Sequence, residues 1–134
     1  MARTPVRAAR VLLMDDEESI RWLGATLLQR MGLEVTVVAE GAAAVREFSD
    51  ARAAGRPFDL VILDLTIPGG MGGQETMEVI RRMDPRVPAI VSSGYSNDAV
   101  LADFRRFGFQ AMVAKPYEID QLVGVVKQVL AQRD

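Results

Sequence analysis

The sequence predicts an α/β protein in which five parallel strands form one sheet, in the order 2-1-3-4-5, doubly wound by five helices. The first observation is that short apolar segments alternate strictly with segments of helical length along the chain. The second is that the short segments are apolar throughout, a pattern typical of strands that helices cover on both faces. Since strand–helix–strand connections are right-handed, this alternation favours a doubly wound sheet.

The expected strands are rich in β-branched residues and cover residues 11–14, 35–39, 60–63, 89–91 and 111–114. The first expected helix covers 19–31, where apolar residues recur with a period near 3.6, namely Ile20, Leu23, Leu27 and Met31. Gly32 follows at a position where helix ends favour glycine. The remaining expected helices cover 42–54, 74–83, 98–107 and 118–130.

Length and composition restrict the class of protein. The 134 residues, 49% of them hydrophobic, fit one compact domain, expected over residues 10–132 after a flexible arm or linker remnant at 1–9. A net charge of −2 argues against nucleic-acid binding. No apolar run reaches the roughly 20 residues of a membrane helix, and no signal-peptide core is present, so we expect a cytoplasmic domain without membrane contact. The absence of cysteine and histidine excludes disulfides and imidazole or thiolate ligands.

Polar residues follow four of the expected strands: Asp15-Asp16-Glu17, Asp64, Ser92-Ser93 and Lys115-Pro116. The carboxyl ends of parallel strands meet at one edge of the sheet, where ligands of doubly wound proteins collect. Carboxylates gathered there repel one another, by up to about 4 kcal/mol for charges about 4 Å apart. Lys115 can neutralise one charge, and a hard divalent cation, best Mg²⁺, can neutralise more.

Each of these residues also has an ordinary structural explanation. Asp15 and Asp16 could cap the helix that follows them. Asp64 could be a turn residue before a proline–glycine loop, Ser92 could open the next loop, and Lys115 could be a solvated charge. Taken singly, each structural explanation is favoured; taken together, complementary charges at one sheet edge favour a functional site.

Four segments together resemble the signature of the response-regulator receiver domain of two-component signalling: VLLMDDEE, VILDLTIPGGMGG, IVSSG and VAKPY. The resemblance extends from about Arg10 to Leu130 and implies a flavodoxin-like fold. It implies Asp64 as the phosphoacceptor, with Ser92 and Lys115 as the residues that contact the phosphoryl group. It implies a Mg²⁺ site formed by Asp15, Asp16, Asp64 and the backbone carbonyl of Thr66. It also implies a cis peptide bond before Pro116.

The same resemblance implies a partner and a mode of action. A histidine kinase or histidine phosphotransfer domain would supply the phosphoryl group, since the chain contains no histidine. The domain would phosphorylate and dephosphorylate itself rather than turn over a substrate, and a weak homodimer is left open. The stretch from Ser92 to Leu122 is similar to receivers of hybrid sensor histidine kinases, so the chain could be a stand-alone protein or an excised domain.

Two departures from the family pattern and one exposed residue complete the analysis. Gly72 replaces a common acid, and Met112 replaces the aromatic residue that reads out the signal in many receivers. Trp22 is expected to face solvent, opposite the core side of the first helix, where it could dock the partner. The alternatives are a degenerate receiver that binds proteins without phosphorylation, a haloacid-dehalogenase-like phosphatase, which expects an acid in place of Thr66, and a nucleotide-binding module.

Overall fold

The computed structural model describes residues 8–65, 67, 69–94 and 102–132. A five-stranded parallel sheet in the order β2-β1-β3-β4-β5 forms the centre of the molecule, which confirms the predicted topology. The strands are β1 (Arg10–Met14), β2 (Glu34–Val38), β3 (Leu60–Asp64), β4 (Ala89–Ser93) and β5 (Ala111–Ala114). The helices are α1 (Glu18–Arg30), α2 (Gly41–Ala53), α3 (Gly73–Met83) and α5 (Ile119–Ala131), with a 3₁₀ helix η1 (Phe104–Phe107).

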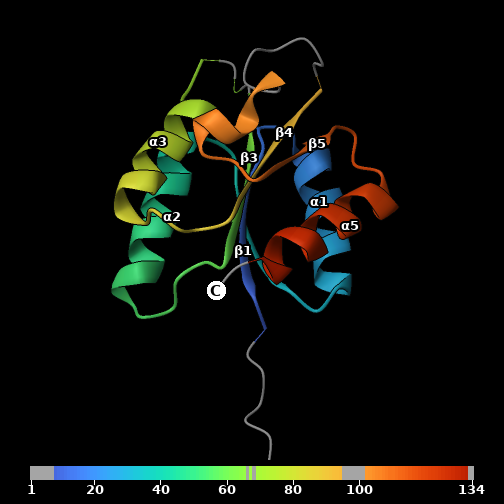
Figure 1. Ribbon diagram of the computed structural model, residues 1–134, viewed down its shortest axis with the longest axis horizontal. Helices are drawn as coiled ribbons and strands as arrows, with labels where there is room; N and C mark the ends of the chain where they lie inside the picture. Colours follow the sequence, from blue (N-terminus) through green and yellow to red (C-terminus); the bar gives the residue numbers. More distant parts are fainter. Residues whose placement is uncertain (1–7, 66, 68, 95–101, 133–134) are drawn as a thin grey trace, which may run out of the picture.

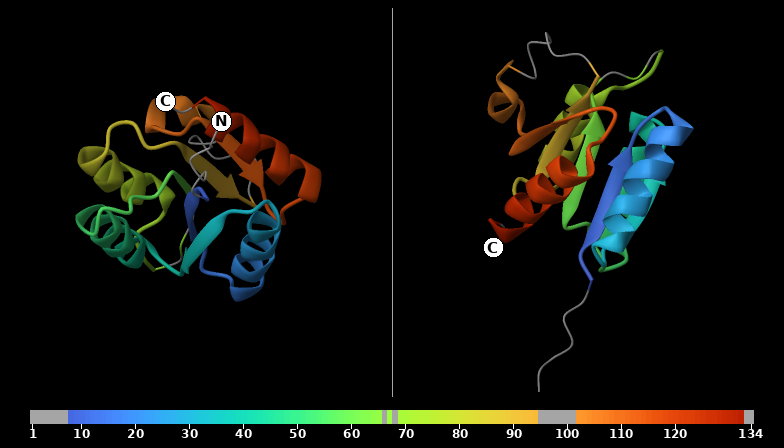
Figure 2. Two further views of the ribbon diagram at one scale, coloured as in Figure 1. Left: turned by 90° about the horizontal axis from the view of Figure 1, so that it is seen from below. Right: turned by 90° about the vertical axis from the view of Figure 1, so that its right-hand side faces the viewer.

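Helices cover both faces of the sheet (Figure 1). On one face α2, α3 and η1 enclose a core cluster that includes Phe48, Met77 and Ile80. On the other face α1 and α5 enclose a second cluster that includes Leu28 and Val126. Figure 2 shows the same layers from two further directions, with the sheet between them. The layers explain why the three central strands are apolar except for polar residues at their ends.

The outer strand β2 departs from the expected burial. It runs from Glu34 to Val38, one residue earlier at each end than predicted, and Val37 is 42% exposed. An edge strand has a neighbour on one side only, so the helices cover it less completely. Helices therefore cover both faces of β2, through Val38 on one face and Val35 on the other, but less completely than the prediction implies.

The fourth predicted helix, over 98–107, differs from the expectation. Residues 95–101 lie outside the described part of the chain, and Phe104–Phe107 form a 3₁₀ helix rather than an α-helix. A 3₁₀ helix places residues i and i+3 on the same side, so Phe104 and Phe107 both pack against the α3 side of the core. Gly108 ends the turn with a φ of 97°, in the left-handed region. In the described residues, no helix is long and apolar enough to cross a membrane.

Candidate functional site

Strand geometry brings the predicted site residues together at the carboxyl edge of the sheet. Side chains alternate between the two faces of a strand, and Leu13 lies in the cluster under α1 and α5. Asp15 comes two residues later and points to the same side. The other site residues also come two positions after a buried residue of that cluster and therefore point to the same face. These pairs are Ile62 and Asp64, Ile90 and Ser92, and Val113 and Lys115.

Hydrogen bonds continue the strand pairing to the site. The Asp15 amide donates to the Val38 carbonyl at 3.1 Å, and the Lys115 amide donates to the Ser93 carbonyl at 3.0 Å. The backbone of Asp15 and Lys115 is therefore held in place by hydrogen bonds to the neighbouring strands. Asp64 lies directly opposite Ser92 in the register of β3 and β4.

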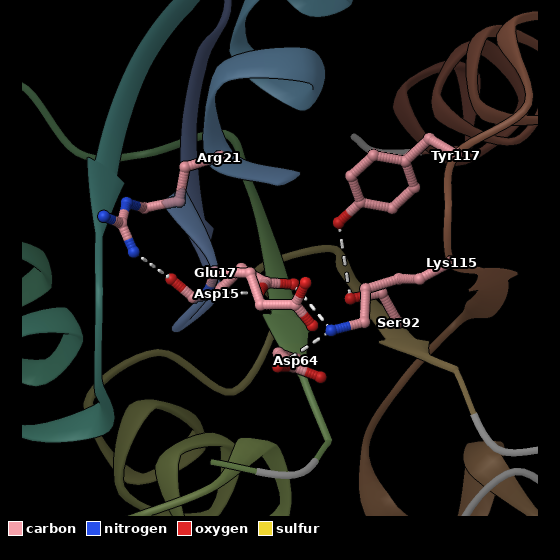
Figure 3. A network of polar contacts seen from close by, with 7 residues as sticks. All are labelled: Asp15, Glu17, Arg21, Asp64, Ser92, Lys115 and Tyr117. Atoms are coloured by element: carbon pink, nitrogen blue, oxygen red, sulfur yellow. Dashed lines mark hydrogen bonds and ion pairs between the residues drawn. The ribbon is translucent and has the colours of Figure 1, made fainter. Parts of the chain in front are cut away.

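Lys115 lies between two buried carboxylates (Figure 3). Its Nζ donates a hydrogen bond to Asp15 Oδ2 at 2.9 Å and forms an ion pair with Asp64 Oδ2 at 3.1 Å. Asp15 is fully buried, Asp64 is 1% exposed, and the Lys115 side chain is 11% exposed. The interpretations of Lys115 as a solvated charge and of Asp64 as a turn residue are therefore wrong.

The electrostatics of the site follow from this burial. The pKa of Asp64 is raised from its ordinary value of 3.8 to about 6, mainly by burial and then by the charge of Asp15, while the hydrogen bond and charge of Lys115 oppose the rise. Burial alone would lower the pKa of Lys115, but hydrogen bonds and charges from both carboxylates outweigh it and raise that pKa above its ordinary value. The ammonium is therefore held charged between the two acids.

Three acidic side chains gather beside the lysine, at the start of α1. Carboxylate oxygens of Asp15, Asp16 and Glu17 lie within 4.8 Å of one another, the first buried and the other two exposed. Asp15 Oδ1 accepts a hydrogen bond from the Glu17 amide at 2.9 Å, which forms a turn just before α1. The N-cap residue of α1 is Glu17, so this bond does not cap the helix as the ordinary explanation of Asp15 and Asp16 expects. The donor set is made entirely of hard oxygens, which is the kind of set that Mg²⁺ prefers.

Two further residues order the site. Arg21 Nη1 donates to the Asp15 carbonyl at 2.8 Å, which ties α1 to the end of β1. Tyr117 lies 6% exposed, and its hydroxyl donates to Ser92 Oγ at 3.4 Å. Ser92 itself is fully buried. The peptide bond between Lys115 and Pro116 is cis, as the family resemblance implies.

The loop after β3 explains one departure from the family pattern. A Cβ on Gly72 would lie 2.5 Å from the Leu65 carbonyl oxygen, and one on Gly73 would lie 2.7 Å from the Asp64 carbonyl oxygen. Glycine is therefore required where these backbones approach each other closely. Thr66, the residue expected to lend a carbonyl to the metal, lies outside the described residues.

Sequence reasoning missed Tyr117 and did not assign Glu17 to the metal site. Glu17 could have been found, because it directly follows Asp15 and Asp16. The contact of Tyr117 with Ser92 carries no local signal, since the two residues belong to separate parts of the chain. Trp22 is 68% exposed, as predicted.

One cavity in the described part of the chain lies away from the site. A cavity of about 530 Å³ lies at the opposite edge of the sheet, lined by residues that precede β3 and β4, among them Phe58, Asp59, Val87 and Pro88. It contains no predicted site residue. This cavity is therefore separate from the predicted site.

Comparison with known proteins agrees with this geometry. A family model of the response regulator receiver domain matches residues 11–127. Sensor kinase CckA of Brucella abortus is 32% identical over 130 residues, which span 95% of this chain and 13% of that protein. Sensory transduction protein RegX3 of Mycobacterium bovis is 35% identical over 120 residues, which span 90% of this chain and 50% of that protein. The chain thus spans half or less of these curated relatives.

Solved structures give the same result. Chemotaxis protein CheY4 of Vibrio cholerae is 26% identical with a TM-score of 0.81, covering 92% of this chain and 99% of that one. NtrX of Brucella abortus is 28% identical with a TM-score of 0.83, covering 93% of this chain and 27% of that one. With the family match spanning most of its length, the chain belongs to the response regulator receiver family of two-component signalling.

Proposed function

We propose that this domain accepts a phosphoryl group on Asp64 from a phosphohistidine of a partner protein, with Mg²⁺ bound, and changes conformation as a result. The observation that supports this most directly is the buried pair of acids bridged by Lys115. The ammonium is 2.9 Å from Asp15 and 3.1 Å from Asp64. The edge of the sheet thus brings together a nucleophile, Asp64, an acid for metal binding, Asp15, and a positive charge, Lys115.

Asp64 would act as the nucleophile. One of its carboxylate oxygens forms a bond to phosphorus while the bond from phosphorus to the histidine nitrogen breaks, and that nitrogen keeps the electron pair. The carboxylate attacks as the anion. Its raised pKa, about 6, still leaves most of the group ionised at neutral pH.

The metal would be held by Asp15, Asp16, Asp64 and the backbone carbonyl of Thr66, with Glu17 close enough to contribute. When bound, Mg²⁺ supplies positive charge that lets an anionic nucleophile approach an anionic phosphoryl group. Asp15 keeps the site ordered on the protein side, because it also binds Lys115 and the start of α1.

Lys115 and Ser92 would recognise the phosphorylated state. Phosphorylation adds roughly −1.5 to −2 charge units at the site. Lys115 can then pair with phosphoryl oxygens, and the Ser92 hydroxyl can donate to one of them. Both contacts differ in energy between the two states, which is what a conformational switch requires.

These 134 residues contain no histidine, so the phosphohistidine would come from another domain or protein. We propose a histidine kinase or histidine phosphotransfer domain as the donor. Trp22, on the solvent side of α1 and 68% exposed, is a suitable anchor for it, because tryptophan is frequent among the residues that dominate binding energy. The start of α1 borders the acidic edge where the donor must arrive.

Intact-mass measurement after incubation with a small acyl phosphate and Mg²⁺ tests the proposal. We expect one labile phosphoryl adduct, absent with EDTA and absent in Asp64→Asn. Asp120→Asn, a change of the same kind at an exposed acid of α5, is the matched control and keeps the adduct. An adduct that persists in Asp64→Asn would place the site elsewhere. No adduct in the unaltered protein would favour a receiver that binds partners without phosphorylation.

A further inference from the structure

The Tyr117 hydroxyl is a buried polar group that the proposed phosphoryl chemistry leaves unused. Tyr117 lies between β5 and α5, two residues beyond Lys115, and its ring is part of the core cluster under α1 and α5. Its hydroxyl donates to Ser92 Oγ at 3.4 Å. Figure 3 shows the hydroxyl directed at Ser92, with Lys115 and Asp64 beyond it.

Helix α1 holds the ring in place. A Cβ added to Gly24 would lie 3.0 Å from Tyr117 Cε2 and 2.7 Å from Leu13 Cδ2. The absence of a side chain at Gly24 therefore makes the space that the tyrosine ring occupies. A glycine in mid-helix costs about 1 kcal/mol relative to alanine, so this space is kept at a cost in helix stability.

The direction of the hydrogen bond determines where the Ser92 proton can point. Burial raises the pKa of Tyr117 to about 12, so its hydroxyl keeps its proton and remains a donor. A serine hydroxyl has one donor and two acceptor lone pairs. When Ser92 accepts from Tyr117, its own proton must point away from the ring. On that side lie Lys115 and Asp64 (Figure 3).

The Met112 side chain lies on the opposite face of the sheet from Ser92 and Tyr117. It packs against the cluster of α2, α3 and η1, whereas Ser92 and Tyr117 belong to the side of α1 and α5. The side chain that replaces the usual aromatic residue is therefore on the wrong face to contact the Ser92 hydroxyl. Tyr117 is the aromatic residue that the described structure places against it.

We propose that Tyr117 is a positioning residue for Ser92, whose hydroxyl it orients so that the serine proton points at the phosphoryl group on Asp64. This inference rests on the proposed phosphoryl-accepting function. Tyr117 acts through Ser92, to which its hydroxyl donates, and the space left at Gly24 accommodates its ring.

A double-mutant cycle with beryllofluoride and Mg²⁺, a phosphoryl analogue, tests the proposal. Its binding is followed by ¹⁹F NMR in the unaltered protein, Tyr117→Phe, Ser92→Ala and the double variant. Tyr117→Phe keeps the ring and removes only the donor. We expect it to weaken the apparent affinity about 2- to 10-fold, the range that one net hydrogen bond supplies. In the Ser92→Ala background the same change should have no further effect, because the group it orients is gone.

The possible results separate this inference from the function on which it rests. The positioning role is wrong if Tyr117→Phe leaves the affinity for beryllofluoride unchanged or strengthens it. It is also wrong if Tyr117→Phe weakens binding by the same factor in the Ser92→Ala variant as in the unaltered protein. In each case the receiver still binds the analogue. Strengthened binding would mean that Ser92 donates to Tyr117 instead. If the unaltered protein neither binds beryllofluoride nor forms the phosphoryl adduct, the proposed function itself is wrong, and the positioning role with it.

Discussion

Lys115→Met should destabilise the metal-free protein strongly. The substitution keeps an unbranched apolar stem and removes the charge that lies 2.9 Å from Asp15 and 3.1 Å from Asp64. Each contact supplies about 5 kcal/mol of attraction at an effective dielectric of 20, and the desolvation of the three groups offsets much of it. What remains after the change is a pair of buried carboxylates without a cation.

Removing one member of a buried ion pair typically costs about 3–5 kcal/mol, and we expect a loss of that size in the free energy of unfolding. With a denaturant dependence of about 2 kcal/mol per molar, the urea midpoint should fall by about 1.5–2.5 M. The assay is urea unfolding in EDTA, followed by circular dichroism. Mg²⁺ should then stabilise Lys115→Met more than the unaltered protein, because it replaces the missing charge.

The chain offers a matched control, since Lys127 is its other lysine and is exposed on α5. Lys127→Met should change the free energy of unfolding by less than about 0.5 kcal/mol, as surface substitutions usually do. Equal, small effects of Lys115→Met and Lys127→Met would refute the reasoning. So would a Mg²⁺ response that Lys115→Met does not increase.

Three further predictions concern the helix glycines, the metal and the partner. Gly124→Ala, where the added Cβ meets no atom within 4 Å, should stabilise the protein by about 0.5–1 kcal/mol in urea unfolding. Gly24→Ala should instead destabilise the protein, because overpacking costs about 1–3 kcal/mol. If both substitutions stabilised the protein equally, the close approach of Leu13 and Tyr117 to Gly24 would be contradicted. Asp16→Ala should weaken Mg²⁺ binding in a calorimetric titration more than Asp15→Ala, since Asp15 already shares its oxygens with Lys115 and the Glu17 amide; equal losses would count against this. Trp22→Ala should slow phosphoryl transfer from the partner's phosphohistidine and leave modification by a small acyl phosphate unchanged; slowing with both donors would show that Trp22 supports the fold.

The sheet could be predicted from the sequence because parallel strands under two helix layers must be apolar along their whole length. Residues 60–63 show this pattern, and every residue of β3 is buried. The gathering of Asp15, Asp64, Ser92 and Lys115 at one edge could be predicted as well. It follows from the topology and from the two-residue alternation of strands, both of which depend on short stretches of sequence.

Features that depend on contacts between distant segments could not be predicted. The hydrogen bond from Tyr117 to Ser92 depends on the space left at Gly24, a residue of α1 far from both in the sequence. The 3₁₀ form of Phe104–Phe107 depends on packing against the α3 side of the core, whereas local periodicity predicted an α-helix. Propensity is a weak guide where tertiary packing decides the outcome.

The most direct test of the central claim is to locate the phosphoryl group chemically. After incubation with a small acyl phosphate and Mg²⁺, borohydride reduces an aspartyl phosphate to homoserine, and peptide mass spectrometry identifies the altered residue. The account predicts homoserine at position 64, dependent on Mg²⁺, with Asp15 and Asp16 unmodified. Homoserine at either of those acids, or reduction at none, would contradict the assignment of Asp64 as the phosphoacceptor.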